Sequence, residues 1–240
     1  MIATALLTTA GQATPLTDAL EKHQNDYAHV LPDKYINGKL LVLDVSKQSE
    51  EFKNVDIHSS KALIEHSNAL KKKHQADMMI GRYLEDRNIY KRNGKLYKSD
   101  EEPRSVHLGM DLMVPAGTAV YAPLAGKVHS FKDNKGAADY GPTIIIEHKL
   151  DGIVFYTLYG HLSRTALPKL KVGQKVAAHQ QIATVGQPFE NGGWPTHLHF
   201  QIIDNMRGEE GHFIGVVQPS LAKQYALICP DPNLILQLPI

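Results

Sequence analysis

The stretch Thr196-His-Leu-His-Phe-Gln-Ile202 has the alternation of a β-strand. Its apolar side chains occupy every second position from Leu198 to Ile202, so His197 and His199 project together from the opposite face. Two neighbouring imidazoles on one face are a candidate metal site. Because an isolated His-x-His motif also fits two surface histidines, the interpretation depends on what other polar residues reach this face.

A second strand pattern with a polar face lies upstream, at Ser105–Leu112. Its apolar residues alternate with His107, Gly109 and Asp111, which share the other face. In a straight strand, four residues at about 3.3 Å each would separate His107 from Asp111 by about 13 Å, too far for one ion. We therefore expect the chain to bend here, because Gly109 leaves room for an ion and tolerates unusual backbone angles.

These residues together have the composition of a catalytic zinc site. His107, Asp111 and one histidine of the later pair make three nitrogen and oxygen ligands, which leaves a fourth tetrahedral position for water. A structural zinc would close the fourth position, usually with cysteine. The pattern alone leaves open which histidine of the pair binds.

A third segment, Phe155–Ser163, ends a β-prone run with His161. The motifs His107-x-Gly-x-Asp111, Tyr159-Gly-His161-Leu-Ser163 and His197-Leu-His199-Phe200 resemble, in order and approximate spacing, those of the M23 zinc metallopeptidases of the lysostaphin and LytM type. The resemblance covers roughly residues 104–205, with a weaker likeness to the chain end. It includes Val114–Val128 and Val172–Val176, which are similar to core strands and turns of that family.

The resemblance implies a fold, a cofactor and a set of roles. The fold would be α+β and predominantly antiparallel β, with an M23-type β-sandwich core. His107, Asp111 and His199 would bind Zn²⁺, while His161 and His197 would orient or deprotonate the water and stabilise the oxyanion. Tyr159 would face the same side as His161 and assist. The expected activity is a zinc-dependent metalloendopeptidase that hydrolyses Gly- or D-Ala-containing, peptidoglycan-derived peptides.

Two departures from the commoner family pattern concern specificity. The loop before His197 reads Glu190-Asn-Gly-Gly-Trp-Pro-Thr196, and Gln201 stands where many members have Glu. In these details the chain resembles M23 modules fused to class III aminotransferase and kinase-like domains. Trp194 in that loop either walls the substrate cleft or covers a core edge.

Other functions fit parts of the pattern. A non-catalytic M23-like module would bind wall fragments or regulate a partner, but such modules typically lose ligands that are present here. A biotinyl or lipoyl carrier would need Lys127 at an exposed hairpin tip beside Met or Ala. A cupin also uses His-x-His, but its remaining ligands follow the pair, whereas His107 and Asp111 precede it.

Composition is that of an ordinary globular protein. The 240 residues are 42% hydrophobic and 21% charged, enough for one ample core or two modest ones. With 26 Lys and Arg against 25 Asp and Glu, the formal net charge is +1, which gives no electrostatic reason to expect a nucleic acid or a membrane as partner. The expected partner is a peptide or peptidoglycan fragment, and the sequence leaves the oligomeric state open.

The expected location is the cytoplasm. The first ten residues lack the basic region and the continuous apolar run of a signal peptide. The single cysteine, Cys229, allows no intrachain disulfide, so nothing favours an oxidising compartment. No stretch approaches the roughly twenty apolar residues of a membrane span.

We divide the chain into an N-terminal extension, residues 1–100, that packs on a peptidase domain at residues 101–240. In the extension, the pattern predicts a helix from Thr14 or Thr17 to Leu31, a buried strand over Gly38–Val45, and a helix from Ser59 or Ser60 that reaches Met78 or Met79. Asn93-Gly94 predicts a two-residue hairpin. Glu85, Asp86 and Arg87 before it fit either an exposed charged turn or the border of a substrate groove.

In the second domain, the four residues Lys149-Leu-Asp-Gly152 between two β-prone runs predict another hairpin. The apolar tail at residues 230–240 is expected to pack back on the core, because an exposed apolar tail would favour aggregation. His129 and His148 match no motif and are expected to be structural or exposed.

Overall fold

A computed structural model describes residues 13–98 and 102–240. Residues 1–10, which we examined for a signal peptide, lie outside these ranges. The predicted domain boundary at residues 100 and 101 lies outside them too. Within them, none of the helices is long and apolar enough to cross a membrane.

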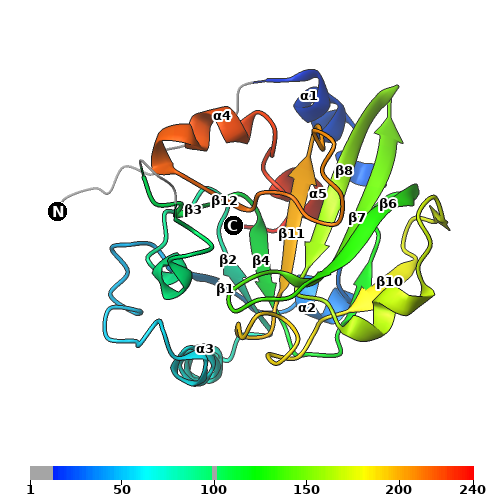
Figure 1. Cartoon of the computed structure of the whole chain (residues 1–240). Coiled ribbons are helices and arrows are strands. Elements are labelled where there is room, and N and C mark those ends of the chain that lie inside the picture. The colour runs from blue at the N-terminus through cyan, green and yellow to red at the C-terminus, as the bar shows by residue number, and fades with distance from the viewer. Residues whose placement is uncertain (1–12, 99–101) are drawn as a thin grey trace.

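A large mixed sheet organises the molecule (Figure 1). Its eight strands lie in the order β1-β2-β4-β11-β8-β7-β6-β9, and all neighbours are antiparallel except the parallel pair β1 and β2. The α+β fold with predominantly antiparallel strands is therefore confirmed. The strands are β1 (Leu40–Leu43), β2 (Met78–Gly81), β4 (Met110–Met113), β6 (Gly126–Asn134), β7 (Gly141–Leu150), β8 (Ile153–Gly160), β9 (Lys175–Val176) and β11 (Leu198–Ile203).

Two smaller antiparallel sheets and short helices complete the described chain. β5 (Ala119–Tyr121) pairs with β10 (Gln181–Thr184), and β3 (Val106–His107) pairs with β12 (Val216–Val217). The helices are α1 (Pro15–Lys22), α2 (Asp33–Ile36), α3 (Ser60–His74), α4 (Ala222–Ala226) and α5 (Asn233–Leu236), with 3-10 turns η1 (Gln24–Asp26), η2 (Ile89–Asn93), η3 (Arg164–Lys169) and η4 (Pro219–Leu221).

Strand alternation gives the large sheet an apolar face and a mixed one. Leu198, Phe200 and Ile202 of β11 enter the main core, which also receives Met110 and Leu112 of β4. The residues between them point the other way, toward a second core and the polar cluster described below. Because side chains alternate with a period of two, burying the apolar set fixes the direction of the histidines.

The N-terminal extension adds its strands to this sheet. β2 pairs with β4 through Ile80 and Leu112, and β1 pairs with β2. Thr14 and Ser59 cap α1 and α3 as expected, because each side-chain oxygen accepts a backbone N–H of the first turn. Both helices are shorter than predicted: α1 ends at Lys22 and α3 ends at His74, so Met78 and Met79 belong to a strand instead.

The predicted hairpin at Asn93-Gly94 is wrong. Residues Ile89–Asn93 form the 3-10 helix η2, and Gly94 has φ −60° where the hairpin turn requires a positive value. The flanking residues form no strand ladder. Their contacts are between side chains: the rings of Tyr90 and Tyr97 touch, and Tyr90 also packs against Trp194 of a distant loop. Contacts made elsewhere in the molecule outweigh the local turn preference.

The other predicted hairpin is confirmed. β7 and β8 pair along their length, from Ile144 opposite Tyr159 to Leu150 opposite Ile153. Asp151 and Gly152 form the turn, with φ of 49° and 89°. Positive φ at both central residues is the type I′ geometry that suits the twist of paired strands. The C-terminal tail also packs back as expected, with Ile235, Leu236 and Leu238 in the main core.

Stability should depend on pH through His148, which is buried between β6 and β8. Its Nδ1 lies 3.0 Å from the Ala125 carbonyl oxygen and its Nε2 2.8 Å from Thr157 Oγ1. Burial lowers the pKa of His148 to about 4. The unfolded chain then binds this proton more readily, so stability is complete above about pH 6.5 and falls by ~3 kcal/mol toward pH 4.

We expect His148→Gln to flatten this loss, and the exposed His58→Gln to leave it unchanged. Urea unfolding of the metal-free protein between pH 7 and pH 4 measures how steeply the free energy of unfolding falls with pH. Equal slopes for wild type and His148→Gln would show that another group causes the acid sensitivity.

Candidate metal centre

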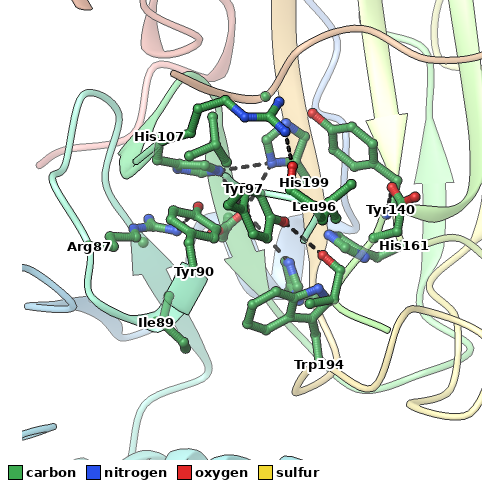
Figure 2. A pocket seen from close by; sticks show the side chains of 18 of the residues that line it. Arg87, Ile89, Tyr90, Leu96, Tyr97, His107, Tyr140, His161, Trp194 and His199 are labelled. Carbon is green, nitrogen blue, oxygen red and sulfur yellow. Dashed lines mark hydrogen bonds and ion pairs between the residues drawn. The ribbon is translucent and has the colours of Figure 1, made fainter. Parts of the chain in front are cut away.

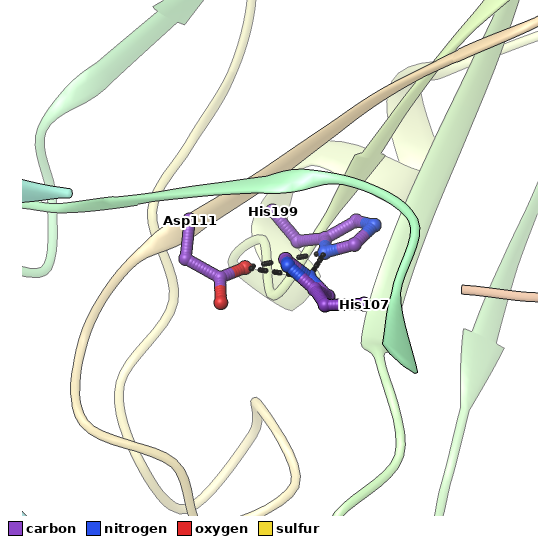
Figure 3. A group of neighbouring side chains, drawn as sticks. All are labelled: His107, Asp111 and His199. Carbon is purple, nitrogen blue, oxygen red and sulfur yellow. Dashed lines mark hydrogen bonds and ion pairs between the residues drawn. The ribbon is translucent and has the colours of Figure 1, made fainter. Parts of the chain in front are cut away.

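Three side chains from β3, β4 and β11 converge at one end of the mixed face (Figure 3). His107 Nε2 lies 2.9 Å from His199 Nδ1 and 3.3 Å from Asp111 Oδ1. His199 Nδ1 lies 3.2 Å from the same Asp111 oxygen. The structure thus brings together the three residues that the resemblance assigns to the metal, as a nearly equilateral triangle.

A break between two short strands makes this convergence possible. β3 ends at His107 and β4 begins at Met110, so the chain bends where the sequence required it. A Cβ on Gly109 would stand 2.6 Å from His199 Nε2, closer than real Cβ atoms approach such an atom. Gly109 is therefore needed for the close approach of the His199 ring, and it has no positive φ.

The outer hydrogen bonds decide which nitrogen of each imidazole is free. His107 Nδ1 lies 3.1 Å from the Arg82 carbonyl oxygen, which only accepts, so this nitrogen carries the proton. The Gln201 amide nitrogen donates to the Ile214 carbonyl oxygen and to Cys229 Sγ, so its oxygen Oε1 faces His199 Nε2, 3.0 Å away, and accepts. His107 Nε2 and His199 Nδ1 are then both unprotonated acceptors.

A zinc ion fits this donor set. Two lone pairs that face one another at 2.9 Å repel, and a cation between them turns repulsion into binding. Tetrahedral Zn–N bonds of about 2.0–2.1 Å separate two ligand atoms by about 3.3–3.4 Å, close to the spacing found. Two imidazoles and one carboxylate suit zinc better than Mg²⁺ or Ca²⁺, which prefer oxygen ligands.

Arg87 holds the second oxygen of the aspartate. Its Nη1 donates to Asp111 Oδ2 at 2.6 Å, while its Nε donates to Glu85. Gly81 gives the guanidinium its space, because a Cβ there would lie 2.7 Å from Arg87 Nη2. With Oδ2 engaged, Asp111 offers Oδ1 alone to a metal.

This environment also sets the charges of the ligands. Burial tends to raise the pKa of Asp111, but His107 and Arg87 outweigh it and hold that pKa well below the ordinary value. Burial, together with Arg87, lowers the pKa of His107 to about 4. At neutral pH the triangle therefore consists of an ionised carboxylate and a neutral His107, as metal binding requires.

His197 and His161 stand beside the triangle with their rings 4.2 Å apart. Their Nδ1 atoms lie 2.7 Å from the Pro195 carbonyl oxygen and 3.0 Å from the Asn191 carbonyl oxygen, so both nitrogens donate. Each Nε2 is left as an acceptor, and His197 Nε2 is 3.6 Å from Asp111 Oδ1. Burial lowers the pKa of both imidazoles, which are neutral at pH 7.

His161 owes its orientation to an unusual backbone angle. Its φ is 60°, the left-handed region that few residues other than glycine adopt, and it directly follows the end of β8. The expectation that Tyr159 lies beside it is wrong: Tyr159 is fully buried in the main core against Phe200. The change of backbone angle at His161 separates the two side chains.

Tyr140, which the sequence did not single out, lies there instead. Its ring centroid is 5.1 Å from that of His199 and 5.8 Å from that of His161 (Figure 2). The His161 backbone N–H donates to the Tyr140 carbonyl oxygen at 2.8 Å, which ties the two residues together. Burial raises the pKa of the Tyr140 hydroxyl well above its ordinary value.

The cluster opens into a cavity of about 680 Å³ that the N-terminal extension helps to enclose. Tyr90, Tyr97 and Trp194 form part of its wall, and Figure 2 shows their rings grouped beside the histidines. Tyr97 Oη donates to the Ala138 carbonyl oxygen at 2.7 Å, and the Arg92 guanidinium lies 4.5 Å from the Trp194 ring centroid. Trp194 therefore both walls the cavity and packs in a small core.

Sequence reasoning found the histidines and Asp111 but missed part of their support. Glu85 and Arg87, at 6% and 4% exposure, are buried, so for them the interpretation as an exposed turn is wrong. Asp86 between them is partly exposed and pairs with Lys47. Arg87 reaches the centre only because β2 places residues 82–87 beside β4. No local pattern predicts that pairing, and none marks Tyr140.

Comparison with known proteins places this centre in a family context. Residues 105–210 match the model of Peptidase family M23, a segment that contains all five predicted site residues. The peptidoglycan DD-endopeptidase ShyA of Vibrio cholerae is 34% identical over 97 residues, which are 40% of this chain and 20% of ShyA. The uncharacterised lipoprotein YgeR of Escherichia coli is 39% identical over 94 residues, 39% of this chain and 33% of YgeR.

The chain thus spans only about a fifth to a third of the length of these curated relatives. Among solved structures, a zinc-containing peptidase from Vibrio cholerae matches at 32% identity with a TM-score of 0.34, over 41% of this chain and 27% of that one.

Replacing Gly109 should weaken metal binding without a general loss of fold. In Gly109→Ala the new methyl group displaces the His199 ring from the triangle, and we expect zinc affinity to fall at least about tenfold. Competition against a chromogenic chelator measures it. Gly94→Ala is the matched control, because no atom lies within 4 Å of a Cβ at that position. Equal affinities for both variants would contradict the close-approach argument.

Proposed function

We propose that the Peptidase M23 family domain at residues 105–210 is a zinc-dependent peptide hydrolase. His107, Asp111 and His199 would hold the ion through Nε2, Oδ1 and Nδ1. When bound, zinc supplies a water of lowered pKa and polarises the carbonyl of the bond to be cleaved. The other residues of the centre would orient the reactants and move protons.

His197 and His161 are proposed as the proton-transfer residues. Each has its Nδ1–H fixed on a backbone carbonyl oxygen and presents Nε2 to the cavity as a base. As the water oxygen bonds to the carbonyl carbon, one Nε2 would accept the water proton and then return it to the leaving amine nitrogen as the C–N bond breaks.

The observation that carries this proposal is the matched set of tautomers. Five separate outer acceptors or donors leave His107, His199, His197 and His161 each with one free nitrogen, and Asp111 with one free oxygen, all directed inward. In a cluster of histidines with a purely structural role, the inner ring nitrogens would instead hydrogen-bond to one another as donor and acceptor. A non-catalytic module remains the alternative function, and the complete ligand set disfavours it.

A peptide with Gly or D-Ala at the cleaved bond, derived from peptidoglycan, is the proposed substrate. Support comes from the name of ShyA as a peptidoglycan DD-endopeptidase and from the resemblance of the motifs to lysostaphin. The cavity of about 680 Å³ has the size of sites that enclose most of a small ligand, which suits a short peptide segment. Cytoplasmic location and the likeness to aminotransferase-fused modules stay predictions.

The ligand assignment predicts about one zinc per chain. His107→Ala and Asp111→Ala each remove one of three ligands, so both variants should lose most bound metal. Inductively coupled plasma mass spectrometry after dialysis against trace zinc measures the content. His58→Ala, which removes an exposed imidazole outside the triangle, should retain zinc. Full occupancy in both ligand variants would refute the assignment.

The division of roles predicts that zinc content and turnover separate. His197→Ala and His161→Ala should keep zinc and lose turnover by about a hundredfold or more, mainly in kcat, because proton transfer occurs only during reaction. His199→Ala should lose both. Zinc analysis is paired with mass spectrometry of cleaved stem peptides. If His197→Ala loses zinc while His199→Ala keeps it, the two histidines have been assigned in reverse.

A further inference from the structure

The loop at residues 190–196 carries the backbone carbonyl groups that fix both proposed bases. His161 Nδ1–H donates to the Asn191 carbonyl oxygen, and His197 Nδ1–H donates to the Pro195 carbonyl oxygen. A shift of this loop would move the acceptors that decide which nitrogen of each imidazole faces the cavity. The orientation of the two bases therefore depends on whatever holds the loop.

The two carbonyl groups belong to one stiff unit. The Trp194 backbone N–H donates to Asn191 Oδ1 at 3.0 Å, and the Asn191 amide nitrogen donates to the Trp194 carbonyl oxygen at 3.2 Å. Asn191 is fully buried, so water does not compete for these hydrogen bonds. Because Pro195 directly follows Trp194, a contact that fixes Trp194 also fixes both acceptors.

Arg92 of the N-terminal extension makes such a contact. Its guanidinium lies 4.5 Å from the Trp194 ring centroid, and both Nη atoms donate to the Gly193 carbonyl oxygen at 3.3 Å. Nη2 also donates to Ser60 Oγ at 2.6 Å, which ties the start of α3 to the same point. The approach is close, since a Cβ on Gly193 would lie 2.7 Å from Ser60 Oγ. A planar fork makes these contacts together, which a lysine ammonium cannot do.

A second contact from the same part of the extension supports the loop. Tyr97 Oη donates to the Ala138 carbonyl oxygen at 2.7 Å, and the Ala138 backbone N–H donates to the Gly192 carbonyl oxygen at 2.8 Å. Tyr97 also lines the cavity, whereas Arg92 is not among the described residues that do so. Arg92 would therefore act on the bases through the loop and not on the substrate.

We propose that Arg92 is a positioning residue that holds the loop at residues 190–196 and, through it, the tautomer and direction of His161 and His197. The inference rests on the proposed proton transfer by these two histidines. The N-terminal extension lies outside the segment that matches the peptidase family, residues 105–210. It is nevertheless a working part of the centre, because it fixes the acceptors of both bases.

The ring tautomers give a direct test. Arg92→Lys keeps the positive charge and loses the planar fork, and Arg92→Ala loses both. In both zinc-loaded variants we expect long-range nitrogen–proton NMR spectra to show mixed tautomers at His161 and His197, where wild type shows Nδ1–H alone. His107, whose Nδ1–H donates to a carbonyl oxygen outside this loop, should keep its tautomer.

Turnover gives a second readout. We expect kcat of both Arg92 variants to fall about tenfold with KM and zinc content nearly unchanged, because the bases are misplaced while the cavity wall and the ligands remain. Lys91→Ala is the matched control, since Lys91 is the preceding residue of η2 and its side chain is exposed. This control should match wild type in tautomers, zinc content and kcat.

The tautomer measurement needs no substrate, so it separates this inference from the proposed function. If wild type cleaves no peptide, the peptidase function fails, while the tautomers still decide the role of Arg92. Unchanged tautomers at His161 and His197 in both Arg92 variants would overturn the inference. A change that extends to His107, or a loss of zinc, would show general loosening of the fold and would also overturn it. If Arg92→Ala does not fold, Arg92→Lys decides.

Discussion

The metal centre depends on two imidazole nitrogens, His107 Nε2 and His199 Nδ1, that face each other at 2.9 Å, each with a lone pair. Such a pair is unfavourable unless a cation lies between them. It persists because the other ring nitrogens donate to the Arg82 carbonyl oxygen and to Gln201 Oε1. Asp111 completes the triangle with one oxygen because Arg87 occupies the other. The geometry of the centre is therefore imposed by neighbours that never contact the metal position.

The sheet supplies the rigidity that such a centre needs. β11 lies between β4 and β8, so the strands that carry Asp111 and His199 and the strand that leads to His161 are direct neighbours. Their apolar alternate residues are locked in the main core, and a slip of one residue would turn the ligands away from the site. Where regular strand geometry would misplace a group, the chain departs from it: a break at Gly109 brings His107 to Asp111, and a positive φ at His161 turns its imidazole into the cavity.

The N-terminal extension contributes to the centre as well as to the sheet. β2 brings Arg87 to Asp111, and the segment after it supplies Tyr90 and Tyr97 to the cavity wall. Tyr140 comes from another loop, and its ring lies beside those of His199 and His161. The ligands, the two proposed bases and the cavity wall thus come from separate parts of the chain, and changes in the surrounding loops can alter which peptide fits without disturbing the metal triangle.

The sequence by itself determined the antiparallel strands that carry the motifs, the bend at Gly109 and the five polar residues of the centre. The strands, the bend and the polar faces with His107, Asp111 and the histidine pair follow from alternation and spacing, which are local properties. The place of His161 and the choice of His199 as ligand came from the resemblance of the motifs to a known family. Tertiary structure alone decided the rest. The same Xaa-Gly signal makes a hairpin at Asp151-Gly152, where the flanking strands pair, and a 3-10 turn at Asn93-Gly94, where Tyr90 and Tyr97 find partners in distant loops. The ring tautomers, the Arg87 clamp and the position of Tyr140 depend on contacts between residues far apart in the chain, and no local pattern encodes such contacts.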